Sequence, residues 1–221
     1  MSEQIALNID CMEYMRTLPD AAFDIAVVDP PYGGVTQGGY MKNQGCQNKA
    51  KRINYDLTLW SQEKPSKEYF KELFRVSKNQ VIWGGNYFQT AINKDSQCWL
   101  IWDKCHQENI TFADCELAWT SFDTATRIFR FKWNGMLQQD MKNKEVKIHP
   151  TQKPVALYKW IYQNYAKPGD RILDTHLGSG SSRIAAKAMN FEFVGCEVAK
   201  SYFDMQEARF NEFINQQSLF Y

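Results

Sequence analysis

The sequence has no Cys-x-x-Cys pair among its 6 cysteines and no apolar run long enough to span a membrane. Scattered cysteines are typical of a reducing compartment, so we expect no disulfide framework. One Cys/His cluster matches no standard zinc spacing, and we expect no metal there; its members are Cys98, Cys105, His106 and Cys115. The first residues, MSEQIALNID, lack the basic and apolar regions of a signal peptide. We therefore expect a cytoplasmic protein with no membrane partner.

An excess of charge of one sign is missing too, because 26 basic and 25 acidic residues leave a net charge of +1. A balanced total does not exclude nucleic acid, since a local basic face can coexist with an acidic remainder. The start of the chain has no Gly-x-Gly-x-x-Gly, the motif expected of a nicotinamide-dependent oxidoreductase. The 221 residues suffice for one large α/β domain with a single core.

Short apolar runs alternate with helix-like stretches, which indicates a largely parallel sheet with helices on both faces. The run Phe23–Val28 is almost purely apolar, as expected for a strand buried on both faces. The expected strands are Ile5–Ile9, Phe23–Val28, Val81–Trp83, Trp99–Trp102, Glu116–Thr120, Arg171–Asp174 and Phe193–Glu197. The expected helices are Met12–Leu18, Lys67–Val76, Pro154–Tyr165, Ser181–Met189 and Lys200–Ile214.

Two basic segments, residues 33–60 and 121–149, interrupt this alternation. From Gly33 to Tyr55 the chain has no Asp or Glu. Loops this long in a compact domain are usually functional or disordered. We interpret both as segments that contact a phosphate backbone, with an ordinary solvated charged loop as the alternative. The residues expected to make these contacts are Lys42, Lys49, Lys51, Arg52, Arg130 and Lys132.

The run ILDTHLGSGSS, residues 172–182, combines a buried strand, a glycine turn and the start of a helix. Glycine lets the backbone pass close to a ligand, and a helix N-terminus offers free N–H groups. Glu197 ends the next strand, where a carboxylate can accept hydrogen bonds from ribose hydroxyls. Such turns also close ordinary βα units. The motif predicts a nucleotide-like ligand without distinguishing NAD, FAD and S-adenosylmethionine.

A second motif, Asp29-Pro30-Pro31-Tyr32, follows directly on the strand that ends at Val28. Two prolines fix φ and remove two N–H donors, so the carbonyl groups stay free and rigidly oriented. Asp29 adds an acceptor and Tyr32 an aromatic face, at the sheet edge where ligands bind in open α/β folds. The plain alternative is a Pro-Pro turn with a capping aspartate.

These motifs resemble those of the DNA amino-methyltransferases, the adenine-N6 and cytosine-N4 methylases with the signature [DNS]-P-P-[YF]. Residues 9–32 are similar to the family's N-terminal block, residues 149–154 to the block before the cofactor strand, and residues 174–182 to the cofactor loop. The catalytic motif precedes the cofactor motif, which is typical of the beta class. The resemblance implies a single Rossmann-like methyltransferase domain over residues 1–221. It further implies a circularly permuted α/β fold with a mostly parallel seven-stranded sheet that has one antiparallel strand.

The resemblance also implies S-adenosylmethionine as the cofactor. It places Asp10 near the cofactor adenine and Glu197 on the ribose. Thr151 and Lys153 are expected near the methionine end. The other expected cofactor-binding residues lie in the cofactor loop: Asp174, His176, Gly178, Ser179, Gly180 and Ser181. In this loop Thr175 and His176 replace the family's usual Pro and Phe, and Ser181 its Thr; we interpret His176 as a polar substitute without an acid/base role.

By the same resemblance Asp29, Pro30, Pro31 and Tyr32 are the catalytic residues. The Asp29 carboxylate and the Pro30 carbonyl are expected to accept hydrogen bonds from an exocyclic amine and to stabilise the charge that develops on nitrogen. The base must be flipped out of its duplex, and Tyr32 is expected to stack on it. Aspartate at the first position is commoner in adenine methylases. Adenine N6 in double-stranded DNA is therefore the expected target.

Several alternatives stay open. The target base could be cytosine, modified at N4. The chain could methylate RNA or protein, or be a catalytically silent nucleic-acid-binding module with the same fold. The turn at residues 83–86 either lines the pocket or only connects a strand to a helix. Because there is no large inserted recognition domain, we expect a short or relaxed DNA target, with a homodimer and a cognate restriction endonuclease as further partners.

Overall fold

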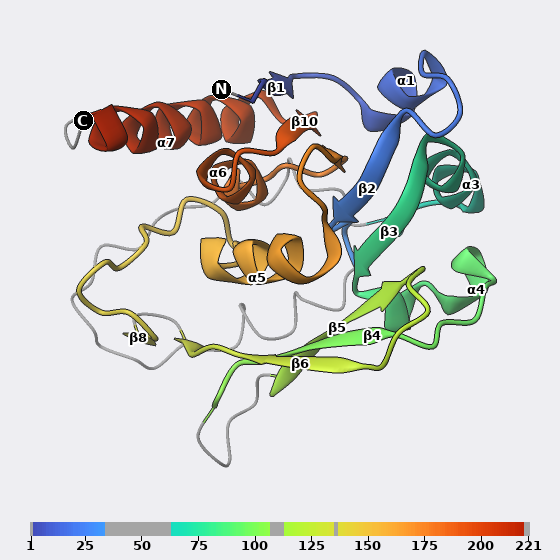
Figure 1. Cartoon of the computed structure of the whole chain (residues 1–221), viewed down its shortest axis with the longest axis horizontal. Coiled ribbons are helices and arrows are strands. Elements are labelled where there is room, and N and C mark those ends of the chain that lie inside the picture. The colour runs from blue at the N-terminus through green and yellow to red at the C-terminus, as the bar shows by residue number, and fades with distance from the viewer. Residues whose placement is uncertain (1, 34–62, 107–112, 135–136, 219–221) are drawn as a thin grey trace.

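The computed structural model describes residues 2–33, 63–106, 113–134 and 137–218, and its centre is an eight-stranded sheet (Figure 1). β5 is antiparallel to both of its neighbours, and all the other neighbouring strands of this sheet pair in parallel. The strands, in their order across the sheet, are β1 (Gln4–Leu7), β10 (Glu192–Cys196), β9 (Arg171–Asp174), β2 (Phe23–Val28), β3 (Ser77–Trp83), β5 (Cys115–Thr120), β4 (Trp99–Asp103) and β6 (Arg127–Arg130).

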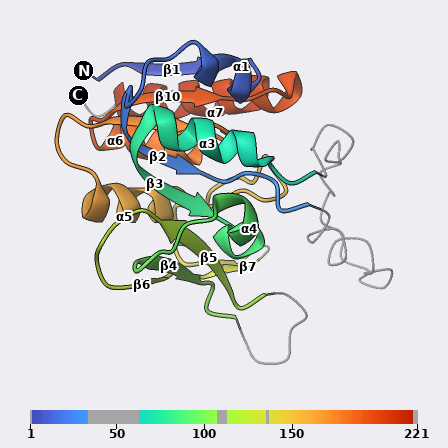
Figure 2. The same ribbon diagram turned by 90° about the vertical axis from the view of Figure 1, so that its right-hand side faces the viewer.

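Helices cover both faces of the sheet (Figures 1 and 2). α5 (Val155–Tyr165) and α6 (Ser181–Ala188) pack on one face, and α1 (Cys11–Arg16) and α3 (Lys67–Val76) on the other. α7 (Lys200–Ser218) packs against α6. The short helices η1 (Gly85–Tyr87) and α4 (Gln89–Ile92) follow β3. None of the helices in the described part of the chain is long and apolar enough to cross a bilayer.

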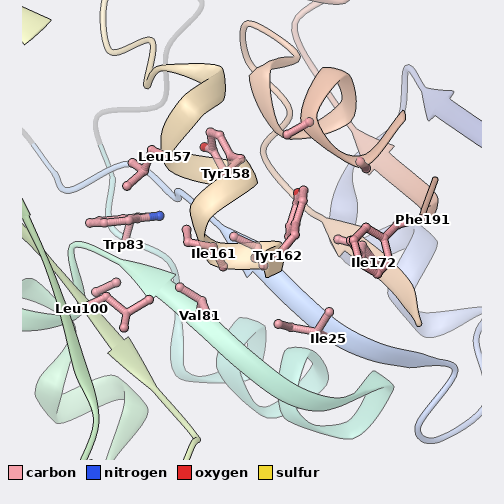
Figure 3. Close-up of a cluster of buried hydrophobic side chains, with 14 of the residues drawn as sticks. Ile25, Val81, Trp83, Leu100, Leu157, Tyr158, Ile161, Tyr162, Ile172 and Phe191 are labelled. Atoms are coloured by element: carbon pink, nitrogen blue, oxygen red, sulfur yellow. The ribbon is translucent and has the colours of Figure 1, made fainter. Parts of the chain in front are cut away.

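From Ile25 to Val28 the side chains of β2 alternate between two hydrophobic cores, which explains the uninterrupted apolar sequence of this part of the strand. Ile25 and Val27 belong to the core under α5, together with Ile161 (Figure 3). Ala26 and Val28 belong to the core on the other face, under α1 and α3. The strand that leads to Asp29 is therefore packed on both faces.

Strands β2 and β9 are neighbours at the topological switch point of the sheet, where the chain connections leave in opposite directions. From β9 the chain passes through α6 to β10 on one side, and from β2 it reaches β3 on the other side. Ligands of open α/β sheets bind outside the carboxyl ends of strands at such a point. The two motifs, which follow β2 and β9, are thus brought to one place although the cofactor strand comes much later in the chain.

The sheet confirms the predicted mostly parallel arrangement with one antiparallel strand, but it has eight strands where seven were expected. The additional edge strand β6 lies inside the segment 121–149, which was predicted to be a loop. The same segment contains the antiparallel pair β7 (Trp133–Asn134) and β8 (Leu137–Gln138). These strands are very short and carry polar residues, so no apolar alternation marks them in the sequence.

Candidate active site

The motif Asp29–Tyr32, which was predicted to be catalytic, lies at the carboxyl end of β2 and is held by a buried lysine. Lys153 Nζ lies 2.5 Å from Asp29 Oδ2, and the lysine side chain is only 3% exposed. The Tyr32 hydroxyl donates to Asp29 Oδ1 at 2.7 Å and accepts from Lys153 Nζ at 3.2 Å. Both oxygens of the Asp29 carboxylate therefore have a donor in this structure.

A second carboxylate shares the same lysine, although the sequence analysis did not identify it. Glu116 Oε2 lies 3.0 Å from Lys153 Nζ, and Glu116 Oε1 lies 2.6 Å from Lys104 Nζ. Glu116 is near the start of β5, and Lys104 follows the end of β4. Because β5 is antiparallel, its amino-terminal end lies at the sheet edge where the parallel strands end. No motif around Glu116 or Lys104 could have predicted their place in the site.

The charges of this cluster influence one another strongly because they are buried. Burial and Glu116 raise the pKa of Asp29, whereas the Lys153 ammonium opposes that shift. Burial alone would lower the pKa of Lys153, but Asp29 and Glu116 outweigh it and raise that pKa, so Lys153 is charged at neutral pH. Against the effect of burial, the two lysines lower the pKa of Glu116 to about 2. Lys153 is thus a cation held between two carboxylates.

The Tyr32 ring packs in an aromatic cluster formed by the turn after β3. It stacks on Tyr87 with ring centroids 5.2 Å apart and meets the edge of Phe88 at 6.0 Å. Gly84 has a φ of +70°, and a Cβ there would lie 2.2 Å from Tyr32 Cε1. The turn at residues 83–86 therefore supports Tyr32, and it does not line the cavity described below.

The cofactor loop after β9 is held by side chains inside the fold. Asp174 Oδ1 accepts from the His176 N–H at 3.0 Å, and Asp174 Oδ2 accepts from the Ser182 hydroxyl. Burial raises the Asp174 pKa to about 7. The Thr175 hydroxyl lies 2.6 Å from Tyr69 Oη and 2.9 Å from His176 Nδ1. Thr175 and His176, two of the three residues that depart from the family pattern, are therefore joined to each other, and Thr175 is joined to α3.

The two carboxylates expected near the cofactor adenine and ribose also shape the backbone. Asp10 caps α1, because its Oδ1 accepts from the N–H groups of Met12 at 2.8 Å and Glu13 at 3.1 Å. Glu197 Oε2 accepts from the Gly178 N–H at 2.9 Å, and Glu197 Oε1 from the Ala199 N–H at 2.9 Å. Asp10 thus fixes the start of α1, and Glu197 fixes the backbone at Gly178 and Ala199.

One cavity of about 380 Å³ brings the two motifs together. Asp29 and Pro31 line it from the catalytic motif. The residues lining it that were predicted to bind cofactor are Asp10, Thr151, Lys153, His176, Gly178, Ser179 and Glu197. Tyr69, His149 and Tyr202 add aromatic walls that the sequence analysis did not assign. The cavity therefore joins an acceptor carboxylate to a loop of the nucleotide-binding type.

Three residues predicted to bind cofactor do not line this cavity: Asp174, Gly180 and Ser181. Gly180, at φ +72°, faces α7, where a Cβ would lie 3.1 Å from Gln206 Oε1. Its lack of a side chain thus accommodates a helix, whereas the sequence analysis expected it to accommodate a ligand. Pro30 and Tyr32 also do not line the cavity, and Pro30 is buried.

Arg209 of α7 supports the cofactor loop and was not found from the sequence. It donates to Ser179 O at 2.7 Å and to Ser181 Oγ at 2.9 Å. It also pairs with Glu145 at 2.6 Å. Glu145 lies in the basic segment 121–149, so an ion pair connects that segment to the cofactor loop.

The predicted phosphate contacts divide into two groups. Lys42, Lys49, Lys51 and Arg52 lie outside the described residues. Arg130 is exposed at the end of β6, and its Nε lies 3.5 Å from Asp103 Oδ2. Lys132 is half-buried. In the part of the chain that the structure describes, no three His, Cys, Asp or Glu side chains are grouped as a metal site would require.

Comparison with known proteins decides the family. The model of the DNA methylase family of N6/N4 methyltransferases matches residues 40–208 of the chain. The chain belongs to this DNA methylase family. The resemblance inferred from the motifs is thereby confirmed.

Individual DNA methylases agree with this assignment. The type II methyltransferase M.HinfI of Haemophilus influenzae is 26% identical over 243 aligned positions, which cover 93% of this chain and 68% of that protein. M.HpaI of Haemophilus parainfluenzae is 37% identical over 73 residues, which cover 33% of this chain and 23% of that protein.

Solved structures of DNA methylases share the fold. The complex of M1.HpyAVI with S-adenosylmethionine superposes with a TM-score of 0.58 at 22% identity, and covers 93% of this chain and 98% of that one. The cytosine-N4-specific PvuII DNA methyltransferase superposes with a TM-score of 0.60 at 11% identity, and covers 98% of this chain and 93% of that one. At these identities the likeness concerns the fold, and it confirms the single Rossmann-like methyltransferase domain.

Proposed function

We propose that this DNA methylase transfers the methyl group of S-adenosylmethionine to N6 of an adenine flipped out of double-stranded DNA. The observation that supports it most is the position of Asp29, which lines the same cavity as the cofactor loop and Glu197. An acceptor for the substrate amine and the cofactor residues of the family thus share one space. The choice of adenine rests on aspartate as the first residue of the motif.

The residues around the cavity fit S-adenosylmethionine, the cofactor of this family. Carboxylates at Asp10 and Glu197 suit the adenine and ribose end. Thr151, Lys153 and the loop backbone at Ser179 suit the charged methionine end. When bound, this cofactor supplies a methyl group on a positively charged sulfur, so the methyl carbon is already electrophilic.

The protein then has to orient the amine and stabilise the charge that develops on it. The Asp29 carboxylate would accept a hydrogen bond from the exocyclic NH₂ and favour a nitrogen whose lone pair can attack. A bond forms between that nitrogen and the methyl carbon while the bond from carbon to sulfur breaks. The nitrogen then releases one proton, for which Asp29 can act as an acceptor because its pKa is raised. Tyr32, supported by Tyr87, would stack on the flipped base.

The basic segments 33–60 and 121–149 are proposed to contact the DNA backbone. Arg130, Lys132, Lys142 and Lys144 are candidates among the described residues. Phosphate contacts position the protein without reading sequence, so their loss should weaken binding to all DNA alike. A homodimer and a cognate restriction endonuclease belong to the same proposal.

The test is mass spectrometry of nucleosides from unmethylated DNA after incubation with the protein and labelled S-adenosylmethionine. Asp29→Ala is the test variant, and Asp24→Ala is its matched control. Asp24 is on the same strand, does not line the cavity, and forms an ion pair of 2.7 Å with Lys78. We expect labelled N6-methyladenine with the natural chain and the control, and none with Asp29→Ala. Labelled N4-methylcytosine would overturn the choice of base. Label in RNA or protein alone would overturn the choice of substrate.

A further inference from the structure

Four charged residues form an alternating chain that begins outside the cavity and ends at two residues lining it, Lys153 and Asp29. In order they are Lys104, Glu116, Lys153 and Asp29, with separations of 2.6, 3.0 and 2.5 Å between successive charged atoms. They come from different elements, namely the end of β4, the start of β5, the segment before α5 and the end of β2. The cluster has two positive and two negative charges, so it is balanced.

Glu116 is the branching point of this chain. Each of its oxygens contacts a different lysine, Oε1 with Lys104 and Oε2 with Lys153. Oε2 also lies 3.4 Å from the Tyr32 hydroxyl, which donates at 2.7 Å to Asp29. Glu116 therefore contacts both groups that donate to the Asp29 carboxylate, and does not itself line the cavity.

We infer that Glu116 is a positioning residue that shares Lys153 with Asp29 and so keeps the Asp29 carboxylate able to accept a hydrogen bond from the substrate amine. This inference rests on the proposed function of Asp29 as that acceptor.

The physical reason is competition for one ammonium group. A buried lysine paired with a single carboxylate would be held tightly by it and would make that carboxylate a poor acceptor. With Glu116 on its other side, Lys153 divides its donors between two anions. Glu116 also raises the pKa of Asp29, in the direction opposite to Lys153. Other ionisable groups around Asp29 stay in place in the test; they are Tyr32, Tyr158 and Asp174.

Two substitutions should move the titration of Asp29 in opposite directions. In Glu116→Gln, Lys153 pairs with Asp29 alone, so the pKa of Asp29 should fall by at least about one unit. In Lys104→Gln, Glu116 loses its other partner and draws Lys153 away, so the pKa of Asp29 should rise. A general loss of structure would not produce two shifts of opposite sign.

Two measurements follow these shifts. The carboxyl carbon of Asp29, assigned by comparison with Asp29→Asn, is titrated by ¹³C NMR in the free protein. The acid limb of kcat/KM for DNA, which reports groups of the free enzyme, is recorded in parallel. We expect both to move to lower pH in Glu116→Gln, with kcat reduced about tenfold or more. Affinity for S-adenosylmethionine, measured by calorimetry, should change less than twofold.

The matched control is Lys78→Gln, which removes an ion pair from the opposite end of the same sheet. It should leave the Asp29 titration and the rate unchanged. An Asp29 titration that does not move in Glu116→Gln, or that moves in the same direction in both variants, would overturn the inference. The NMR titration needs no turnover, so it still tests the inference if the natural chain fails to methylate DNA. That failure would overturn the proposed function separately.

Discussion

Lys153 Nζ lies 2.5 Å from Asp29 Oδ2, so the lysine of the block before α5 is paired with the aspartate of the Asp-Pro-Pro-Tyr motif. The sequence analysis expected Lys153 at the methionine end of the cofactor. It does line the cavity, but its ammonium group is paired with Asp29 and Glu116 and donates to the Tyr32 hydroxyl. The residue thus connects the block assigned to the cofactor with the block assigned to catalysis.

Replacing this lysine should damage both stability and turnover. Lys153→Met leaves Asp29 and Glu116 as neighbouring buried carboxylates, which should cost about 3–5 kcal/mol of unfolding free energy and lower kcat about 100-fold. Denaturant unfolding and methyl transfer measure the two effects, with Lys78→Met as the control for an exposed ion pair. A variant with normal kcat and weak cofactor affinity would instead place Lys153 on the cofactor alone.

Asp10 has two roles that can be separated by substitution. It caps α1 through Met12 and Glu13, and it lines the cavity. Asp10→Ala should lose about 1 kcal/mol of stability and bind S-adenosylmethionine more weakly. Asp10→Ser restores a capping side chain, so stability should recover while cofactor affinity stays low. Recovery of both in thermal unfolding and calorimetry would mean that capping is the main role.

Arg209 should affect cofactor binding without touching the cavity. Its bonds to Ser179 and Ser181 hold the cofactor loop, and Glu145 holds Arg209. Charged hydrogen bonds of this kind contribute about 1.5–3 kcal/mol, so Arg209→Gln should weaken cofactor binding about tenfold. Glu145→Gln should have a smaller effect. If the two act together, the double variant should be no weaker than Arg209→Gln; additive losses would show that they act independently.

Replacing Gly84 should have two effects, strain of the left-handed backbone and a clash with the Tyr32 ring, and a matched control separates them. Gly84→Ala introduces a Cβ 2.2 Å from the Tyr32 ring at a φ of +70°. Gly169→Ala has a comparable backbone problem, at φ +91°, with nothing within 4 Å of the new Cβ. The left-handed backbone should cost each variant about 1 kcal/mol of stability, and the overlap with Tyr32 should cost Gly84→Ala more. Only Gly84→Ala should reduce methyl transfer, because it displaces Tyr32. Equal activity of the two variants would contradict the role given to this turn.

His149 should make stability depend on pH. Burial lowers its pKa to about 4 from 6.5, with Lys153 adding to the effect. Between these values the unfolded chain binds a proton that the folded chain does not, so stability falls as pH falls from 6.5 to 4. His149→Phe, which keeps an aromatic ring against Tyr202, should remove this loss. The difference in unfolding free energy between the two proteins should change by about 3 kcal/mol across the window, and no change would contradict the lowered pKa.

The fold could be predicted from sequence where burial leaves a pattern. β2, β9 and α3 have the bounds that their apolar residues predicted. β3 begins at Ser77, earlier than expected, because its first residues are polar and carry no strand signal. β6, β7 and β8 were missed for the same reason, since an edge strand with exposed residues needs no apolar alternation.

The sequence by itself determined the two motifs and the strands that end at them, because a proline-fixed acceptor and a glycine turn are local chemistry. The tertiary structure alone decided the surroundings of Asp29. Glu116 reaches the site because β5 runs antiparallel, and Lys104 because β4 pairs with it. Which charges meet in a buried site depends on strand order and direction, and no local pattern in the chain records either.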